Sequence, residues 1–196
     1  MTFVLIGLAV TAVVWLVLTY NALIGLKNQV RNAWKQIDVQ LKRRHDLIPN
    51  LVNTVKGAMS HERETLDAVI TARNQAIAAQ GSGSVARMGA AEQQLTGALG
   101  RLLAVVEAYP DVKATANVAQ LQEELTSTEN KIAFARQGYN DMATLYNTRQ
   151  QQFPTNLVRG LANAEEAELW ELTEAAERIV PQVDLSLGRP AARPRA

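Results

Sequence analysis

Side chains that often carry chemistry are scarce in this sequence, which has two histidines and no cysteine. The stretch from His61 to Thr65 (His-Glu-Arg-Glu-Thr) begins like the helical zinc-protease motif, in which two histidines four residues apart bind the metal. Thr65 stands where the second histidine is required, so the motif would supply only one zinc ligand. We therefore interpret this stretch as a solvated helix face and expect no metal site.

The other common catalytic arrangements are also incomplete. A serine or threonine nucleophile needs a base within hydrogen-bonding reach, and neither His45 nor His61 lies in a recognisable arrangement of that kind. The glycine-rich stretch at 81–84 lacks the lysine of a phosphate-binding loop, and no Glu-x-x-His pair of the di-iron type is present. A formal net charge of +1 is also unlike that of a nucleic-acid-binding protein. We expect a protein that is not an enzyme, needs no cofactor and binds no nucleic acid.

A basic cluster at Lys42, Arg43 and Arg44 is the clearest concentration of charge. We favour a solvated helix face that also signals membrane topology, and the alternative is a contact with lipid headgroups or an anionic partner. On a straight helix the cluster lies about 24 Å beyond Leu26, which exceeds the Debye length of about 8 Å. It would reach lipid only if the helix bent or lay on the membrane.

Polar residues surround a proline directly after this cluster, at His45, Asp46, Pro49 and Asn50. Pro49 lacks an N–H and its ring clashes with the preceding turn, so it should kink the helix or mark a joint. A broken helix also frees backbone groups for other partners. We therefore consider this segment a candidate conformational joint or partner contact.

The element that positions these residues begins with an apolar segment. Residues 1–26 carry no charged side chain, and the apolar run at 3–18 is interrupted only by Gly7 and Thr11. A bilayer core about 30 Å thick needs roughly 20 helical residues. A cleaved signal peptide is the alternative, but no basic residue precedes the run and no A-x-A cleavage site follows it. We predict an uncleaved transmembrane signal-anchor at residues 1–26.

Positive charge lies on one side of this segment. Several lysines and arginines follow the span closely, whereas only the α-amino group precedes it. The positive-inside rule therefore predicts a single-pass protein with its N-terminus outside and residues 27–196 in the cytoplasm. The lack of cysteine, and hence of disulfides, agrees with this location.

Apolar residues at helical spacing fill most of the remaining chain, and no strand-like alternation is present. They predict a helical region at 27–80, a second helix ending at Pro110, a third at 117–153 and a shorter fourth at 164–180. The third is the best defined, with a seam that ends with Tyr146, Arg149 and Phe153. The fold class is therefore all-α: one N-terminal transmembrane helix, then a long antiparallel, coiled-coil-like helical bundle at 27–180. The basic tail at 181–196, rich in proline and arginine, is expected to be disordered.

The part of the seam nearest the membrane consists of Val30, Trp34, Ile37 and Leu41. If residues 27–80 form one helix, the second helix is too short to cover this seam, which would then contact another copy or a partner. A break at 57–60 would instead give four helices of comparable length and bury the seam within the chain. The heptad phase favours the first arrangement and the helix lengths favour the second, so both remain open.

Several stretches resemble the signature of the LemA family closely. They are 20–24, 33–52, 54–57 followed by His61-Glu62, Tyr109 to Ala114, Leu121-Gln122, 129–133, Ala135-Arg136, Tyr139-Asn140, Tyr146-Asn147 and Phe153-Pro154. After Gly160 the chain departs from the family pattern. The resemblance implies an external N-terminus, one span and a cytoplasmic helical bundle, without a settled activity. Some members belong to magnetosome membranes, which suggests membrane organisation only by analogy.

Two functions agree with these observations. The first is a single-pass, membrane-anchored helical scaffold that self-associates or organises partners at the inner face of the bacterial membrane. The second is a helical adaptor subunit that regulates a membrane enzyme or protease. The expected partners are the lipid bilayer, further copies of this chain and a membrane protein whose identity the sequence does not reveal.

Overall fold

The first helix forms both the apolar N-terminal segment and the first element of the bundle. A computed structural model of the protein describes residues 1–171, and in it α1 spans Thr2–Val55 as one helix of 54 residues. It is the one helix of this described part that is long and apolar enough to cross a membrane, and no other segment buries its apolar stretch. The helix continues through Pro49 without ending there.

Five shorter elements follow α1. They are α2 (Arg63–Gln80), α3 (Val85–Val106), α4 (Pro110–Lys113), α5 (Ala116–Gln151) and the 3-10 helix η1 (Thr155–Leu157). Residues 1–171 contain helices and turns but no strand, which confirms the all-α prediction. Local signals fix several boundaries: Ser84 accepts a hydrogen bond from the N–H of Arg87 at the start of α3, and Pro110 is the first residue of α4.

Between α1 and α2 the chain turns at residues 56–62. The helical region at 27–80 is therefore broken where Gly57 to Ser60 allowed a break, and the arrangement with four helices is the one that forms. The turn is closed by Met59, whose side chain is fully buried. Its backbone N–H donates to the carbonyl oxygen of Val55.

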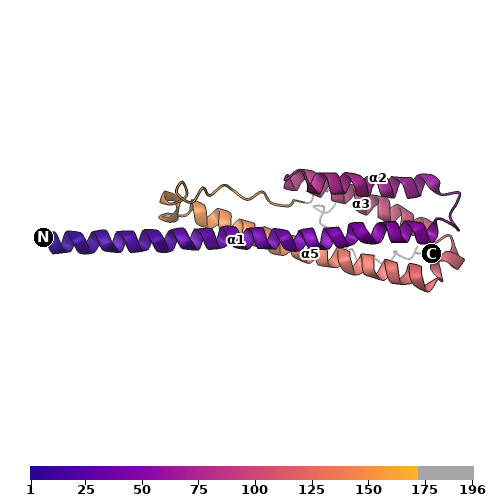
Figure 1. Ribbon diagram of the computed structural model, residues 1–196, viewed down its shortest axis with the longest axis horizontal. Coiled ribbons are helices and arrows are strands. Elements are labelled where there is room, and N and C mark those ends of the chain that lie inside the picture. The colour runs from indigo at the N-terminus through magenta and orange to yellow at the C-terminus, as the bar shows by residue number, and fades with distance from the viewer. Residues whose placement is uncertain (172–196) are drawn as a thin grey trace, which may run out of the picture.

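The four long helices form an elongated bundle from which the N-terminal part of α1 projects alone (Figure 1). α5 runs back along α1 and makes the most extensive helix–helix contact, and α2 and α3 form a second antiparallel pair. This second pair covers the half of the bundle farther from the N-terminus (Figure 1). The end of α5 therefore returns toward the apolar part of α1.

Three groups of buried side chains follow one another along the bundle. The largest is at the far end, where Leu51, Val69 and Leu102 are fully buried. The second, in the middle, contains Ile37 and Leu41. The third, nearest the apolar segment, joins Leu23 of α1 with Tyr146 of α5 and with Ala162 and Ala164.

Two predictions near the C-terminus are wrong in part. Residues 164–171 are not helical, and they run as an irregular, extended segment against α5. The rest of the predicted fourth helix and the tail at 181–196 lie outside the described residues. The predicted seam of α5 also changes face near its end, because Arg149 and Phe153 are exposed whereas Gln150 is fully buried.

Candidate functional site

Pro49 leaves one backbone carbonyl of α1 without its helical donor. In an α-helix the carbonyl of His45 would accept from the N–H of residue 49, and proline has none. Arg73 of α2 supplies the missing donor, since its Nε donates to the His45 carbonyl oxygen over 2.7 Å. The segment that we interpreted as a joint is thus a continuous helix tied to α2.

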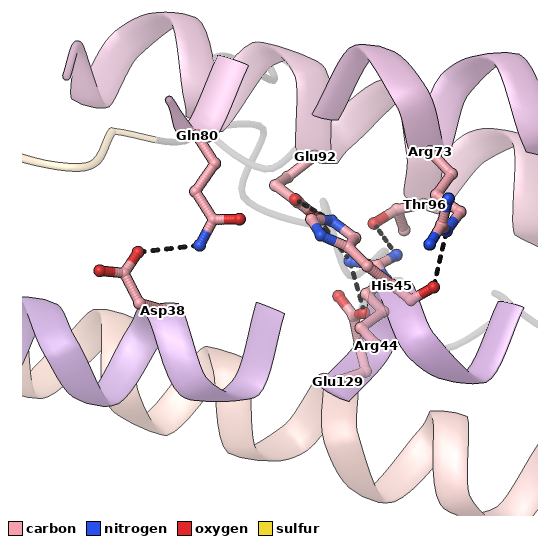
Figure 2. A network of polar contacts seen from close by, with 8 residues as sticks. All are labelled: Asp38, Arg44, His45, Arg73, Gln80, Glu92, Thr96 and Glu129. Atoms are coloured by element: carbon pink, nitrogen blue, oxygen red, sulfur yellow. Dashed lines mark hydrogen bonds and ion pairs between the residues drawn. The ribbon is translucent and has the colours of Figure 1, made fainter. Parts of the chain in front are cut away.

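A buried carboxylate lies directly beside this point. Glu92 of α3 accepts from Arg44 Nη1 at 3.4 Å and contacts His45 Nε2 at 2.8 Å, and all three side chains are buried (Figure 2). Two consecutive residues of α1 therefore share one acceptor. Because an isolated buried charge is very costly, the contact between Arg44 and Glu92 compensates the burial of both side chains.

Two further contacts complete the surroundings of Arg44. Its Nη2 donates to Thr96 Oγ1 at 2.7 Å, and its Nη1 forms a second ion pair with the half-exposed carboxylate of Glu129 at 3.0 Å (Figure 2). Arg44 therefore joins α1 to both α3 and α5. This group of polar residues, Arg44, His45, Arg73, Glu92, Thr96 and Glu129, is the central polar network.

The basic cluster is divided by the fold. Lys42 is exposed, and Arg43 is a half-exposed residue paired with Glu124 of α5 at 3.1 Å. Arg44 is buried, so the interpretation of a solvated face holds for only part of the cluster. The reason is the helical rotation of about 100° per residue, which turns Arg44 toward α3 and α5.

The residues of the predicted joint also separate. His45 is buried, Pro49 is partly buried, and Asp46 and Asn50 face solvent. Only His45 takes part in the central polar network. The exposed pair remains available to solvent on one face of α1.

The membrane-proximal seam is covered within the chain. Ile37 and Leu41 are fully buried against residues of α3 and α5. Trp34 is partly buried and packs edge-on against Tyr139 of α5, with ring centroids 5.0 Å apart and planes at 63°. Val30 packs beside them as a partly buried residue. Of the two arrangements that the sequence left open, the one with the seam buried within the chain is the one that forms, because α5 and α3 cover it.

A cleft of about 610 Å³ opens beside the outer end of this seam. Trp34 and Tyr139 contribute aromatic walls, Met88 is apolar, and Lys27 and Arg31 add positive charge. The cleft lies immediately beyond the apolar segment, because Lys27 is the first charged residue of the chain. Its mixture of aromatic and cationic groups suits a protein segment better than a polar small molecule.

Two asparagines of α5 hold residues 164–171 in their extended form. The Asn147 amide donates to the carbonyl oxygen of Ala167 at 2.9 Å and accepts from its N–H at 2.8 Å. Asn140 makes the same pair of bonds with Trp170, at 3.0 and 2.9 Å. An extended segment must satisfy its backbone groups outside itself. These amides do so, which explains why residues 164–171 need not be helical.

The same segment connects α5 to the start of α3. Tyr139 donates from its hydroxyl to the carbonyl oxygen of Glu168 at 2.6 Å. The Glu168 carboxylate accepts from the N–H groups of Val85 and Ala86, at 3.1 and 3.2 Å, as a negative charge at a helix N-terminus should. Burial, and next the Glu168 charge, raises the pKa of Tyr139, which therefore remains a donor at neutral pH.

The histidines and carboxylates of residues 1–171 do not gather into a metal-binding cluster. No group of three or more His, Cys, Asp or Glu side chains there could hold a metal ion. His61 is exposed, and Glu62 accepts a hydrogen bond from the Tyr109 hydroxyl at 3.3 Å. The polar groups at the centre of the bundle are instead engaged with one another.

Fold and site together define a class: a membrane-anchored, all-α protein whose span continues directly into a helical bundle. A model of the LemA family matches residues 33–185, and the chain belongs to that family. The matched region contains the central polar network, the asparagine pairs and all residues of the cleft except Lys27, Val30 and Arg31.

Several similar proteins carry a magnetosome name. Magnetosome protein MamQ 2 of Paramagnetospirillum magneticum is 24% identical, and magnetosome protein MamQ of Magnetospirillum gryphiswaldense is 25% identical. Each alignment covers 86% of this chain and 71% of the relative. Protein LemA of Metamycoplasma hominis is 28% identical over 70% of this chain and 62% of the relative. None of these names denotes a reaction.

Proposed function

We propose that this protein is a membrane-anchored helical scaffold that holds a partner protein at the inner face of a bacterial membrane. The observation that carries the proposal is the continuity of α1, which is both the membrane segment and the first helix of the bundle. No flexible linker separates the two parts, so the body stands at a fixed angle to its anchor. A fixed body suits the positioning of a partner better than a tethered, freely moving domain does.

The cleft beside Lys27 and Trp34 is the contact that we propose for this partner. It lies next to the membrane, where a segment of another membrane protein would emerge from the bilayer. Aromatic residues and arginine, both found here, are the types most enriched in protein interfaces. The relatives named as magnetosome proteins support a role in membrane organisation by analogy.

Self-association remains part of the proposal, although not through the buried seam. Ile37 and Leu41 are fully buried, so two copies could meet there only after α5 had moved away. A second copy could occupy the cleft instead. The alternative function, an adaptor subunit that regulates a membrane enzyme or protease, would use the same surface with one defined enzyme as its partner.

The proposed location of the body rests on charge. The lysines and arginines that come after the span favour a cytoplasmic body. A single cysteine at Ser60, which is exposed in the turn after α1, would test this placement in a chain that has no other cysteine. An impermeant thiol reagent added to intact cells should leave this cysteine unlabelled but should label a cysteine at Thr2. Labelling at Ser60 without lysis would place the body outside.

Site-specific crosslinking in native membranes tests the scaffold. A photo-crosslinking residue at Arg31, an exposed residue of the cleft, should capture a discrete partner. The matched control is Lys35, one turn further along α1, which is exposed but does not line the cleft. Capture of the same chain would indicate self-association, and stoichiometric capture of one enzyme would indicate the adaptor. Equal yields at the two positions would contradict the cleft as the partner site.

A further inference from the structure

The end of α5 reaches the level of the membrane segment. The part of α1 beyond Lys27 is about 43 Å long, whereas the 36 residues of α5 extend about 54 Å. α5 runs antiparallel to α1 (Figure 1), and by these lengths its last turns extend past Lys27 along the apolar segment. Buried contacts agree, because Tyr146 of α5 packs against Leu23.

A groove of about 640 Å³ shows how far this overlap goes. Leu18 and Thr19 line it from α1, and Arg149 and Thr155 line it from the end of α5 and from η1. Leu18 is the last residue of the apolar run at 3–18. The α1 side of the groove runs from Leu18 to Gln29, so Thr155 lies beside the boundary between the apolar segment and the charged part of α1, where the bilayer surface would be if α1 spans it.

The segment after α5 carries apolar side chains that nothing in the described part of the chain covers. Phe153, Leu157 and Leu161 are 79%, 67% and 66% exposed. They are spaced four residues apart around η1. Lys27 fixes this segment to α1, since its Nζ donates to the carbonyl oxygen of Asn163 at 2.9 Å.

We propose that residues 153–161 form a second membrane contact, which we call the foot. The foot inserts Phe153, Leu157 and Leu161 into the interfacial layer of the same bilayer that α1 crosses. The bilayer is the occupant because it is already present at this level, and because a bundle in water would otherwise expose three large apolar residues at one end. This inference needs α1 to be a membrane anchor and does not depend on any protein partner.

Charge at the foot agrees with the phosphate layer of a bilayer. Arg149 lines the groove between apolar walls and forms no ion pair with any of residues 1–171. An arginine at the boundary of an apolar groove suits a phospholipid phosphate, which accepts bidentate hydrogen bonds. The foot and α1 together hold the bundle at two points and so fix its rotation about the axis of α1.

Fluorescence depth measurements on the full chain in nanodiscs test the foot. The nanodiscs contain phosphatidylcholine and phosphatidylglycerol, and single cysteines at Phe153 or Leu157 carry the fluorophore NBD. We expect strong quenching by nitroxides attached to lipid headgroups or to the upper acyl chain. We also expect reduction by aqueous dithionite to be several-fold slower than at a water-exposed position.

Phe134 of α5 provides the matched control, because it is also a phenylalanine and is 76% exposed. It lies about 28 Å before Phe153 along the helix direction, well away from the membrane. NBD at Phe134 should be reduced rapidly and should escape lipid quenchers. Far-UV circular dichroism like that of the unlabelled chain establishes that each labelled protein is folded, as is expected for exposed positions.

Two results would overturn the foot. The first is lipid quenching and dithionite reduction at Phe153 and Leu157 equal to those at Phe134. The second is protection from dithionite without lipid quenching, which would show that a second copy covers the segment. Leu157→Asp adds an independent readout: with NBD at Phe153, lipid quenching should fall several-fold because a charge in the interfacial layer displaces the foot. Unchanged quenching in this variant would also count against it.

Discussion

Arg73 donates from Nε to the carbonyl oxygen of His45 over 2.7 Å, in the position that a backbone N–H of α1 would occupy if residue 49 were not proline. This single bond explains why α1 continues through Pro49. A helix-interior proline removes one hydrogen bond and leaves a carbonyl unpaired. In this bundle the unpaired carbonyl becomes a contact between α1 and α2, which otherwise touch over a small area.

Arg73→Ala should lower the free energy of unfolding by about 1–3 kcal/mol, since it leaves the His45 carbonyl without a donor. In a Pro49→Ala background the same substitution should cost much less, because an alanine in place of the proline can supply the N–H. Thermal unfolding of the four proteins in a double-mutant cycle measures this coupling. Arg63→Ala is the control. Arg63 is on the same helix, and its side chain forms no hydrogen bond or ion pair within residues 1–171, so its loss should be nearly neutral. Equal costs of Arg73→Ala in both backgrounds would mean that its bond to His45 is unimportant.

Glu92→Gln should be strongly destabilising, by about 3 kcal/mol, because it removes the buried negative charge that compensates Arg44. Glu129→Gln removes the other carboxylate that forms an ion pair with Arg44, but the Glu129 side chain is 47% exposed. Its loss should therefore cost less than about 1 kcal/mol. Chemical denaturation of both variants gives the comparison. A smaller cost for Glu92→Gln than for Glu129→Gln would contradict the assignment of Glu92 as the central acceptor.

The helices were largely predictable because they are long and periodic. The prediction of a helix at 117–153 matches α5 closely. Its apolar residues keep helical spacing, and Pro154 prevents the helix from continuing. The break between α1 and α2 was only one of two alternatives. Heptad phase continues across it, and the turn is decided by tertiary packing around Met59, which periodicity does not report.

The central polar network could be predicted only in part. The sequence indicated that Pro49 frees a backbone group, but the donor, Arg73, lies 28 residues from His45 and has no local signal. Arg44 was grouped with two exposed neighbours because charge runs usually face solvent. Its burial depends on Glu92, 48 residues away. Contacts between residues so distant in sequence follow from the helix packing and not from any local pattern.

The extended segment at 164–171 was predicted as a helix for an identifiable reason. Alanine and glutamate have high intrinsic helix propensity, and this stretch is rich in both. The side-chain amides of Asn140 and Asn147 override that preference by pairing with the backbone of the segment. Both asparagines belong to the stretches that resemble the LemA signature. The resemblance therefore marked these two residues, but the sequence did not show that their side chains bind the backbone of residues 164–171.

Asn147→Ala should release the middle of this segment, because it removes both bonds to Ala167 and leaves two backbone groups without partners. We expect a loss of about 2 kcal/mol in the free energy of unfolding. The Ala167 amide should also exchange hydrogen several-fold faster. Asn130→Ala is the control, since Asn130 is exposed on the same helix and should change stability by less than about 0.5 kcal/mol. Unchanged exchange at Ala167 would show that Asn147 does not hold the segment.

Tyr139 should make stability fall at high pH. Its pKa is raised above 10.0 by burial and then by Glu168, so the folded state favours the neutral phenol. A raised folded-state pKa contributes stability that is fully present below the unfolded pKa and is lost as the pH rises through the folded one. Tyr139→Phe should cost about 1 kcal/mol at neutral pH through its lost bond to Glu168. It should then lose less stability than the natural chain between neutral pH and pH values above 10.0. Parallel pH curves for the two proteins would contradict this role.

The double variant Trp34→Ala with Leu41→Ala distinguishes a seam within the chain from a seam between copies. Leu41 is fully buried and Trp34 packs against Tyr139, so removing both side chains leaves a cavity inside one bundle. We expect a loss of at least about 4 kcal/mol in the free energy of unfolding, measured by thermal or chemical denaturation of the full chain. Crosslinked oligomers, if copies meet at the cleft or elsewhere, should persist in the fraction that remains folded. The opposite result, a bundle of unchanged stability whose oligomers disappear, would mean that the seam lies between copies and that α5 does not cover it.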